Sequence, residues 1–422
     1  MRRAILSAVL LSASACSPGA KVTANVVAGK ALGSKGAGLS QRQDGLLATT
    51  SSTSLQSLQY AITDIQICSD LERTGSGYNN PTGCFRVFSN PNIPTTQDFY
   101  RDYVLSTALT DTTPGRFVDL MTAEGQAALR NPATAEPAPV GTYRYGLINF
   151  LRPIRVTAEF PVLGSTSGEV VRTRATTSVQ SLPGDGMFTL ERALVGDSLS
   201  AAPAEQATYM LNNGGAYFAF ASPFEVTSQE AAAGTAIQMD LVFNPANFGN
   251  VTGAPGGDCT QDAMAPICDT VNGLMFEMPF VRMSPVPRKA GDQTRKEVYL
   301  VDFESGNMAS KLRVELYYNA SDSEKAVRGV DVALVYLPTA TQRANNNVSG
   351  ARLAQTGSVA DGTATVTLQN YEGTPELSGI LRGQSGTATF NCASPSGDIC
   401  RTVGSSAPRA YTFEGDVLVS GD

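Results

Sequence analysis

Histidine and tryptophan are both absent from this chain of 422 residues. A protein without histidine cannot form a Ser-His-Asp triad, a Cys-His nucleophile, a histidine-containing zinc site or a histidine-ligated haem. It also lacks the side chain that usually senses pH near neutrality. Aromatic residues make up only 7% of the sequence, so flat platforms for stacking against sugars are few. These absences exclude most of the common nucleophilic and metal-dependent chemistries.

The short motifs of nucleotide-binding and hydrolytic enzymes are missing as well. The chain has no Walker loop, no GxGxxG and no GxSxG. Residues 164–168 come nearest to GxSxG, but Thr166 stands at the nucleophile position, and this Gly/Ser stretch predicts a hairpin loop. No Cys-x-x-Cys occurs, so the cysteines do not indicate redox catalysis.

Acidic residues outnumber basic ones, 38 against 31, and the net charge is −7. Affinity for nucleic acid depends on clustered lysine and arginine side chains. We therefore expect no nucleic-acid partner.

The N-terminus has the pattern of a secretion signal. Arg2 and Arg3 precede an apolar run over residues 4–11, far shorter than the roughly 20 residues that cross a bilayer. The run ends in Ser12-Ala13-Ser14-Ala15-Cys16. This ending resembles the lipobox of bacterial lipoproteins, although Ala13 stands where that family usually has leucine.

The lipoprotein resemblance implies that residues 1–15 are removed and that Cys16 carries lipid, including palmitate. Ser17, in place of an aspartate, implies sorting to the outer membrane, with the body facing the periplasm or the cell surface. The alternative is an ordinary Ala-x-Ala cleavage site and a released protein.

The cysteine count favours lipidation, because seven cysteines leave an even set of six once Cys16 is modified. The six lie in three close pairs, each flanking a loop rich in Gly, Pro, Asn or Ser. We predict disulfides that staple these loops, namely Cys68 with Cys84, Cys259 with Cys268, and Cys392 with Cys400.

Composition divides the mature chain into a tether and two domains. Residues 16–57 have few large apolar side chains and predict a flexible tether, in which residues 21–27 form at most an edge strand. A β-rich domain, of one or two subdomains, follows over 58–287. Residues 284–292, with Pro285, Pro287 and Gly291, predict a solvated linker before a second domain over 296–422.

Period-2 alternation in short segments predicts an all-β fold of immunoglobulin-like β-sandwich domains, with two short helices in the first domain. The first strand changes phase near Thr63 and Asp64, which indicates a bulge. Residues 212–215 predict a hairpin turn between strands at 207–211 and 216–220. Helical signals occur at 96–109 and 122–130.

The second domain contains the pattern Val327-Arg328-Gly329-Val330-Asp331-Val332-Ala333-Leu334, followed by a hairpin around Asp361-Gly362-Thr363-Ala364-Thr365-Val366. With these segments, residues 312–390 resemble the bacterial immunoglobulin-like domains of invasin and intimin. The resemblance implies a β-sandwich used in adhesion.

Direct candidates for a functional site are few. Asp258, Asp262 and Asp269 surround one predicted disulfide loop and make calcium the only metal that the sequence suggests. Turn-forming aspartates explain them equally well, and no other cofactor is expected. Tyrosines at 143, 145, 317 and 318 are either exposed faces or packing residues.

The sequence therefore predicts a non-catalytic outer-membrane lipoprotein for binding, adhesion or envelope scaffolding, with an unidentified protein or glycan ligand and no catalytic residues. The alternative is a carboxylate-dependent glycan hydrolase of the cell envelope, which needs only two acids about 5 to 10 Å apart and no histidine. Nothing in the sequence selects such a pair from 38 acidic residues.

Overall fold

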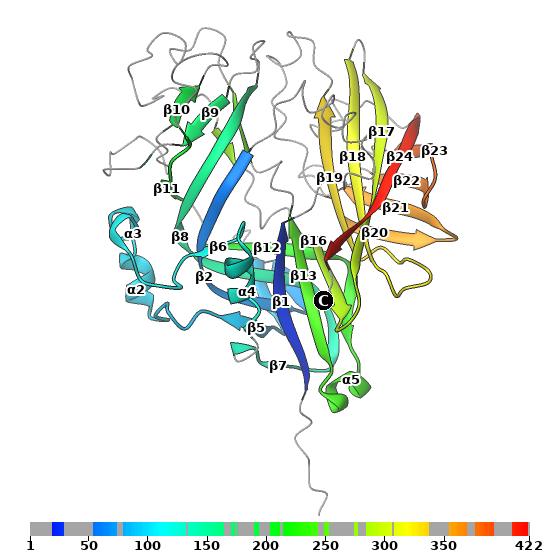
Figure 1. Ribbon diagram of the computed structural model, residues 1–422. Helices are drawn as coiled ribbons and strands as arrows, with labels where there is room; N and C mark the ends of the chain where they lie inside the picture. The colour runs from blue at the N-terminus through cyan, green and yellow to red at the C-terminus, as the bar shows by residue number, and fades with distance from the viewer. Residues whose placement is uncertain are drawn as a thin grey trace, which may run out of the picture.

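The computed structural model describes residues 19–28, 54–73, 79–131, 134–163, 170–173, 175, 190–193, 203–211, 214–243, 249–252, 274–276, 284–305, 308–336, 354–368, 376–391 and 407–420. Over these residues the protein is an all-β sandwich, as the sequence predicts. Its strands form three main sheets and one small hairpin (Figure 1).

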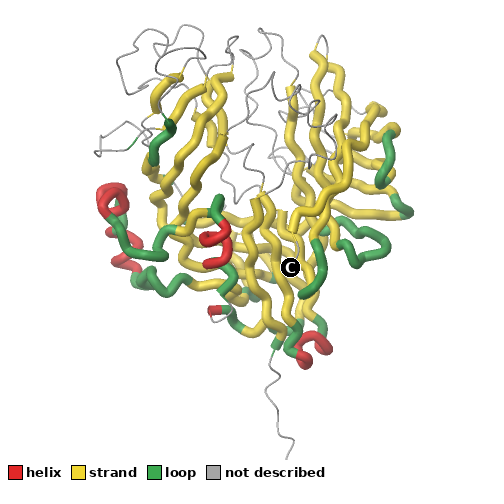
Figure 2. The backbone as a smooth tube through the Cα atoms, in the orientation of Figure 1, coloured by secondary structure: helices red, strands yellow, loops and turns green. Residues whose placement is uncertain are grey.

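The central sheet has four strands in the order β16 (Ser284–Lys289), β13 (Ala236–Phe243), β1 (Ala20–Ala28) and β7 (Pro137–Ala138). It lies between the two larger sheets (Figures 1 and 2). Because side chains alternate along a strand, its two faces contact different partners. Val22, Ala24 and Val26 pack into the core shared with the large sheet, whereas Val27 packs against Tyr317 of the C-terminal sheet.

The large sheet has ten strands, and most of them pair with the long strand β8 or with β2. Its strands are β2 (Ser54–Cys68), β5 (Phe85–Ser89), β6 (Val118–Asp119), β8 (Gly141–Leu163), β9 (Val170–Thr173), β10 (Leu190–Ala193), β11 (Ala207–Met210), β12 (Gly215–Val226), β14 (Gly249–Thr252) and β15 (Leu274–Phe276). The hairpin of β3 (Asp70–Arg73) and β4 (Asn79–Thr82) follows β2.

The C-terminal sheet has eight strands in the order β19-β18-β17-β24-β23-β22-β21-β20. Their bounds are β17 (Thr294–Ser305), β18 (Met308–Asn319), β19 (Gly329–Tyr336), β20 (Ala354–Ala360), β21 (Thr363–Leu368), β22 (Glu376–Leu381), β23 (Gly386–Asn391) and β24 (Ala407–Ser420). The predicted tight turn is confirmed, because Asp361 and Gly362 both have positive φ between the paired residues Ala360 and Thr363.

The two edges of the C-terminal sheet face each other, so the sheet nearly closes. A Cβ added to Gly357 of β20 would lie 2.6 Å from Val330 Cγ2 of β19, so only glycine permits this approach. The large sheet covers the seam. Ser222, in the bulge of β12, donates a hydrogen bond of 2.8 Å to the Val327 carbonyl, and Ala221 joins the C-terminal core.

The strand predicted within the N-terminal segment at 21–27 is confirmed, and the flexible-tether prediction is wrong for residues 20–28. Residues 20–28 form β1, which pairs in parallel with β13 along eight residues and with β7 at Ala20 and Lys21. Four of its side chains, those of Ala20, Val22, Ala24 and Val26, are fully buried. Residues 29–53 of the predicted tether lie outside the described part of the chain.

The predicted solvated linker at 284–292 is also wrong. Residues 284–289 form β16, which pairs with β13, and the Arg288 side chain is buried. The chain leaves the central sheet at Lys289 and enters the C-terminal sheet at Thr294. The invasin-type resemblance of residues 312–390 stays a prediction; its first patterned segment leads into β19, and its second forms the hairpin between β20 and β21.

The predicted hairpin at 212–215 is wrong. Both β11 and β12 run antiparallel to β8, so the chain keeps its direction through this interruption. The guanidinium of Arg152 donates to the Leu211 carbonyl at 2.7 Å, and the Leu211 amide donates to the Arg152 carbonyl at 2.9 Å. Strands β11 and β12 therefore follow one another in one direction along β8, with Met210 paired to Pro153 and Gly215 to Asn149.

Predictions that depend on neighbouring residues, namely the bulge and the helix caps, agree with the structure more often than predictions of which strands pair. The bulge is confirmed, since the register of β2 with β8 shifts between Ile62 and Asp64. Thr122 caps α4 (Ala123–Ala128) as expected, and Thr96 caps α2 (Gln97–Asp102), but the 96–109 stretch breaks before α3 (Leu105–Thr110). A further helix, α5 (Ser228–Ala233), was missed although Thr227 and Glu230 form a capping box.

A buried hydrogen-bond network around Asp240 joins the central and C-terminal sheets. The Asp240 carboxylate accepts from Asn25 Nδ2 at 2.6 Å, Arg288 Nε at 2.8 Å and Thr294 Oγ1 at 2.7 Å. The Ser420 hydroxyl also donates to it. Five strands therefore meet at one carboxylate that has no solvent exposure.

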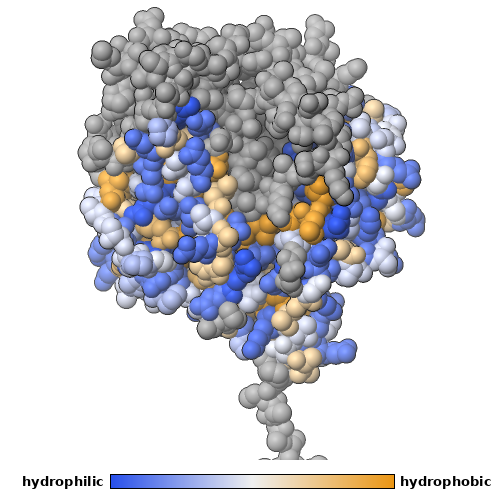
Figure 3. Space-filling model, in the orientation of Figure 1, coloured by the Kyte–Doolittle hydropathy of each residue, from blue (hydrophilic) through white to orange (hydrophobic). Residues whose placement is uncertain are grey.

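Figure 3 shows the same arrangement from outside, with polar side chains over both flanks. Apolar side chains gather mainly in the middle of this face, where the central sheet meets the C-terminal sheet. Among the described residues, no helix has the length and apolar character needed to cross a membrane.

We predict that Asp240→Asn strongly destabilises the fold. The substitution removes the charge that offsets buried Arg288 while keeping the side-chain size, and we expect the free energy of unfolding to fall by about 3 to 5 kcal/mol. Urea denaturation followed by circular dichroism measures this change. Asp98→Asn, which breaks an exposed ion pair with Arg101 on α2, is the control and should leave the denaturation midpoint unchanged. Equal effects of the two substitutions would contradict the role of Asp240.

Candidate functional site

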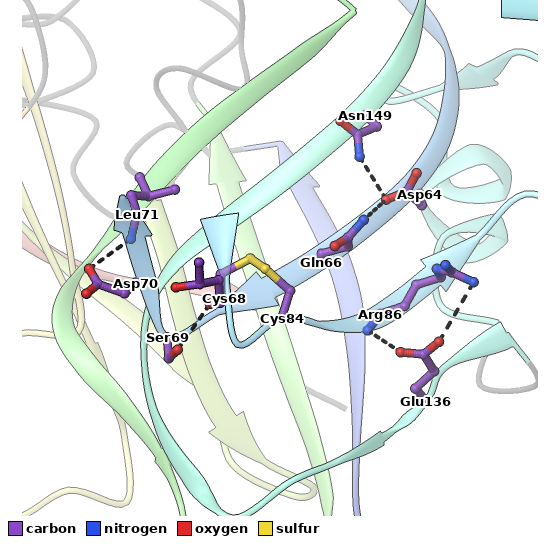
Figure 4. The surroundings of a disulfide bond; sticks show 11 residues. Asp64, Gln66, Cys68, Ser69, Asp70, Leu71, Cys84, Arg86, Glu136 and Asn149 are labelled. Carbon is purple, nitrogen blue, oxygen red and sulfur yellow. Dashed lines mark hydrogen bonds and ion pairs between the residues drawn. A yellow bond between two sulfur atoms is a disulfide. The ribbon is translucent and has the colours of Figure 1, made fainter. Parts of the chain in front are cut away.

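The outer face of the large sheet carries a row of polar side chains beside a disulfide (Figure 4). Asp64 of β2 lies opposite Asn149 of β8, and Gln66 lies opposite Leu147 one step further along. Tyr217 of β12 pairs with Leu147 on the other side of β8. The alternate residues Ile65 and Ile148 point into the core, so this set faces outward.

Asp64 holds the two amide side chains in place. Its Oδ1 accepts from Gln66 Nε2 at 2.6 Å and from Asn149 Nδ2 at 2.9 Å, and its Oδ2 accepts from Thr63 Oγ1 at 3.1 Å. Each amide therefore keeps one N–H and its carbonyl oxygen. Neither Gln66 nor Asn149 makes another side-chain hydrogen bond to the residues that the structure describes.

Two tyrosines flank this polar group. Tyr100 of α2 lies close to Thr63, Asp64 and Arg86, and burial, the largest influence, raises its pKa. Its side chain is 38% exposed and that of Tyr217 is 37% exposed, although both are large aromatic residues. Leu147 forms an apolar floor between Gln66 and Tyr217 and is nearly buried. We call Asp64, Gln66, Leu147, Asn149, Tyr100 and Tyr217 the outer-face site.

Glycine at position 215 leaves space beside Asn149. A Cβ added to Gly215 would lie 3.0 Å from Asn149 Oδ1 and 3.4 Å from the Ile148 carbonyl oxygen. A larger residue would press on the amide oxygen that faces outward.

The predicted disulfide between Cys68 and Cys84 is confirmed and lies at one end of the site. It joins the last residue of β2 to the residue before β5, with their Cα atoms 4.0 Å apart. Arg86 of β5 pairs with Gln66 of β2 and makes an ion pair of 3.8 Å with Glu136. The disulfide thus fixes the two strands that carry Gln66 and Arg86.

A second cluster of charged groups is buried in the C-terminal sheet. Glu315 accepts from Lys296 Nζ at 2.9 Å and from the Tyr317 hydroxyl at 2.6 Å, and lies 2.8 Å from Arg313 Nη2. Asp331 stands opposite Glu315 in the register of β18 with β19. These side chains share the face that meets the central sheet through Tyr317.

The electrostatics of this cluster hold Glu315 ionised. Burial raises its pKa, but Lys296 and Arg313 together outweigh burial and lower the pKa to about 2. Burial, with the charges of Glu315 and Asp331, raises the pKa of Tyr317 well above its usual value. A catalytic acid of a glycan hydrolase needs a raised carboxyl pKa, and Glu315 has the opposite.

Glu297 is buried on the other face of the same sheet. It accepts from the Tyr299 hydroxyl at 2.7 Å, from Arg382 Nε, and from Lys325 Nζ at 3.4 Å. Tyr299 belongs to the C-terminal core, whereas Tyr317 contacts the central sheet. Glu297 and Glu315 therefore point to opposite sides and cannot act as a pair of catalytic acids.

The structure places the predicted site residues as follows. Tyr143, Tyr317 and Tyr318 are buried, which confirms packing rather than exposure, and Tyr145 is half-buried. In the described part of the chain, no group of three or more acidic or cysteine side chains is placed to hold a metal ion. Outside that part lie Cys16, Cys259, Cys268, Cys392, Cys400, Asp258, Asp262 and Asp269.

The outer-face site itself was missed. The sequence did indicate the bulge near Thr63 and Asp64, after which Asp64 and Gln66 face outward. It did not indicate Asn149, because this residue is 85 positions from Asp64 and is brought to it only by strand pairing.

Comparison with known proteins gave no match: no family model matches the sequence, and neither the curated proteins nor the solved structures contain a significant relative.

Glu315→Gln should destabilise the protein in a pH-dependent way. Since the folded pKa of Glu315 is about 2 and its usual value is 4.5, the carboxylate contributes stability above pH 4.5 that is lost as the pH falls towards 2. We expect the variant to lose about 3 kcal/mol of unfolding free energy at pH 7. The gap to wild type should shrink between about pH 5 and pH 2 in denaturant titrations. Exposed Glu136→Gln is the control, and a gap that is constant with pH would refute this account.

Replacing Cys68 and Cys84 together by serine should lower the free energy of unfolding by about 3 kcal/mol, because the bridge closes a loop of 16 residues in the unfolded chain. Denaturation of the wild type and of the double variant, both without reductant, provides the matched measurement, because reductant would also break the other two predicted disulfides. If the double variant is as stable as the oxidised wild type, the bridge has no stabilising role.

Proposed function

We propose that this protein is a lipid-anchored outer-membrane protein that binds a ligand or supports the envelope without catalysis. The lipobox-like sequence ending in Cys16 supports the anchor. The ion pairs that occupy Glu315 and Glu297 favour a structural role for the most deeply buried acids. The outer-face site supplies a surface with unused hydrogen-bonding groups.

The position of β1 is the main observation behind the proposal, because it limits how far the body can lie from a lipid on Cys16. Cys16 precedes the first strand residue, Ala20, by four positions. A fully extended chain covers about 3.5 Å per residue, so four residues reach at most about 14 Å. A lipid on Cys16 would therefore hold the body close to the membrane surface, with no long stalk. This arrangement favours a role next to the membrane over a stalked adhesin.

We expect Cys16→Ser to abolish lipid labelling. Cells of a Gram-negative host that express the wild-type protein and are grown with an alkyne analogue of palmitate should yield a labelled protein in the membrane fraction. The Cys16→Ser variant should be unlabelled and absent from that fraction, whereas the control, in which Cys68 and Cys84 of the disulfide are both replaced by serine, should keep the label. Labelling of Cys16→Ser, or an unlabelled wild type released into the medium, would refute the lipid anchor.

A further inference from the structure

The outer-face site has a pre-arranged set of hydrogen-bonding groups. Asp64 orients both amides, and each amide keeps a donor and an acceptor for a ligand. Groups that the protein already holds in position lose little conformational entropy on binding. A ligand rich in hydroxyl groups matches this set, because a hydroxyl both donates and accepts.

The aromatic and apolar groups of the site suit the other part of such a ligand. Tyr100 and Tyr217 offer partly exposed rings on either side of the polar centre, and Leu147 lies between Gln66 and Tyr217. A sugar ring has a C–H face that packs on aromatic and apolar surfaces, with hydroxyls at its edge. The strip runs across β5, β2, β8 and β12, which is roughly 14 Å at about 4.8 Å per strand. This span accommodates several rings in a row.

The charges of the strip argue for a neutral ligand. At its centre Asp64 is negative, and Arg86 at its end is paired with Glu136. The nearest described cation, Arg86, is already paired with Glu136, so an anionic glycan would meet the carboxylate of Asp64 and no unneutralised positive charge among the described side chains of the strip.

A peptide ligand fits less well. Extended peptides usually add to an open strand edge through their backbone. Here Gln66 and Asn149 lie on β2 and β8, each of which is paired on both sides, so at these positions the sheet presents side chains and no open backbone edge.

We propose that the outer-face site binds a neutral oligosaccharide, with Gln66 and Asn149 hydrogen-bonding to its hydroxyls and Tyr100 and Tyr217 packing on its rings. This inference deepens the binding role proposed above and names its ligand class.

Isothermal titration calorimetry of the full chain in detergent tests the proposal, with cellohexaose, hexa-N-acetylchitohexaose and maltohexaose as neutral probes and a hyaluronan hexasaccharide as the charged probe. We expect at least one neutral probe to bind. Gln66→Ala and Asn149→Ala should each weaken that binding roughly tenfold, the effect of one or two lost hydrogen bonds. Gln384→Ala, in the exposed turn between β22 and β23, and Asn391→Ala, at the exposed end of β23, remove the same kinds of side chain away from the site and should leave binding unchanged.

Three results would overturn the proposal: no neutral probe binds, binding survives both site substitutions, or the charged probe binds most tightly and is lost in Asn149→Ala. Gln66→Leu keeps the side-chain volume, and an unchanged denaturation midpoint in this variant separates loss of binding from loss of folding. The palmitate labelling is independent of these titrations, so a lipidated protein that binds no neutral sugar would refute the site alone.

Discussion

The buried carboxylate of Asp240 is the interaction on which the arrangement of the central and C-terminal sheets depends. Its four donors come from β1, β16, β17 and β24, so it links the first and last described strands of the chain. A buried carboxylate is costly unless hydrogen bonds and a cation compensate for lost water. Because only this packing of the central and C-terminal sheets supplies all four donors, the network specifies how the sheets meet.

The buried charged groups of the C-terminal sheet differ from the polar groups of the outer-face site. Glu315 and Glu297 are buried and ion-paired, and each accepts a hydrogen bond from a tyrosine hydroxyl, so these carboxylates stabilise the fold. Asp64, by contrast, lies on an outer face and orients two amides that retain hydrogen-bonding capacity. The rigid core formed by Ile65 and Ile148 behind this face holds the site in position.

Features set by local chemistry could be predicted from the sequence. The tight turn at Asp361 and Gly362, the cap at Thr122 and the bulge before Asp64 each depend on neighbouring residues. Thr227, Glu230 and Gly234 gave an equally local signal for α5, which was overlooked. All of these features depend on short-range hydrogen bonds and backbone preferences, which can be read from a few neighbouring residues.

Features set by distant pairing could not be predicted. The sequence around β1 is poor in large side chains, and its partner β13, more than two hundred residues later, is what makes it a strand of the body. In the sequence, Arg288 has the character of an exposed linker residue. Only the fold shows that it is buried beside Asp240. The outer-face site likewise exists only because β2 pairs with β8 in one register, which places Asp64 against Asn149.

Hydrogen–deuterium exchange of the full chain tests the central claim, that β1 is a strand of the body next to its proposed anchor. The account predicts that those amides of residues 21–27 that bond to β13 exchange as slowly as the amides of β13, because both strands belong to one hydrogen-bonded sheet. Exchange of residues 21–27 at the rate of an unstructured peptide, with β13 still protected, would contradict it and restore the long flexible tether.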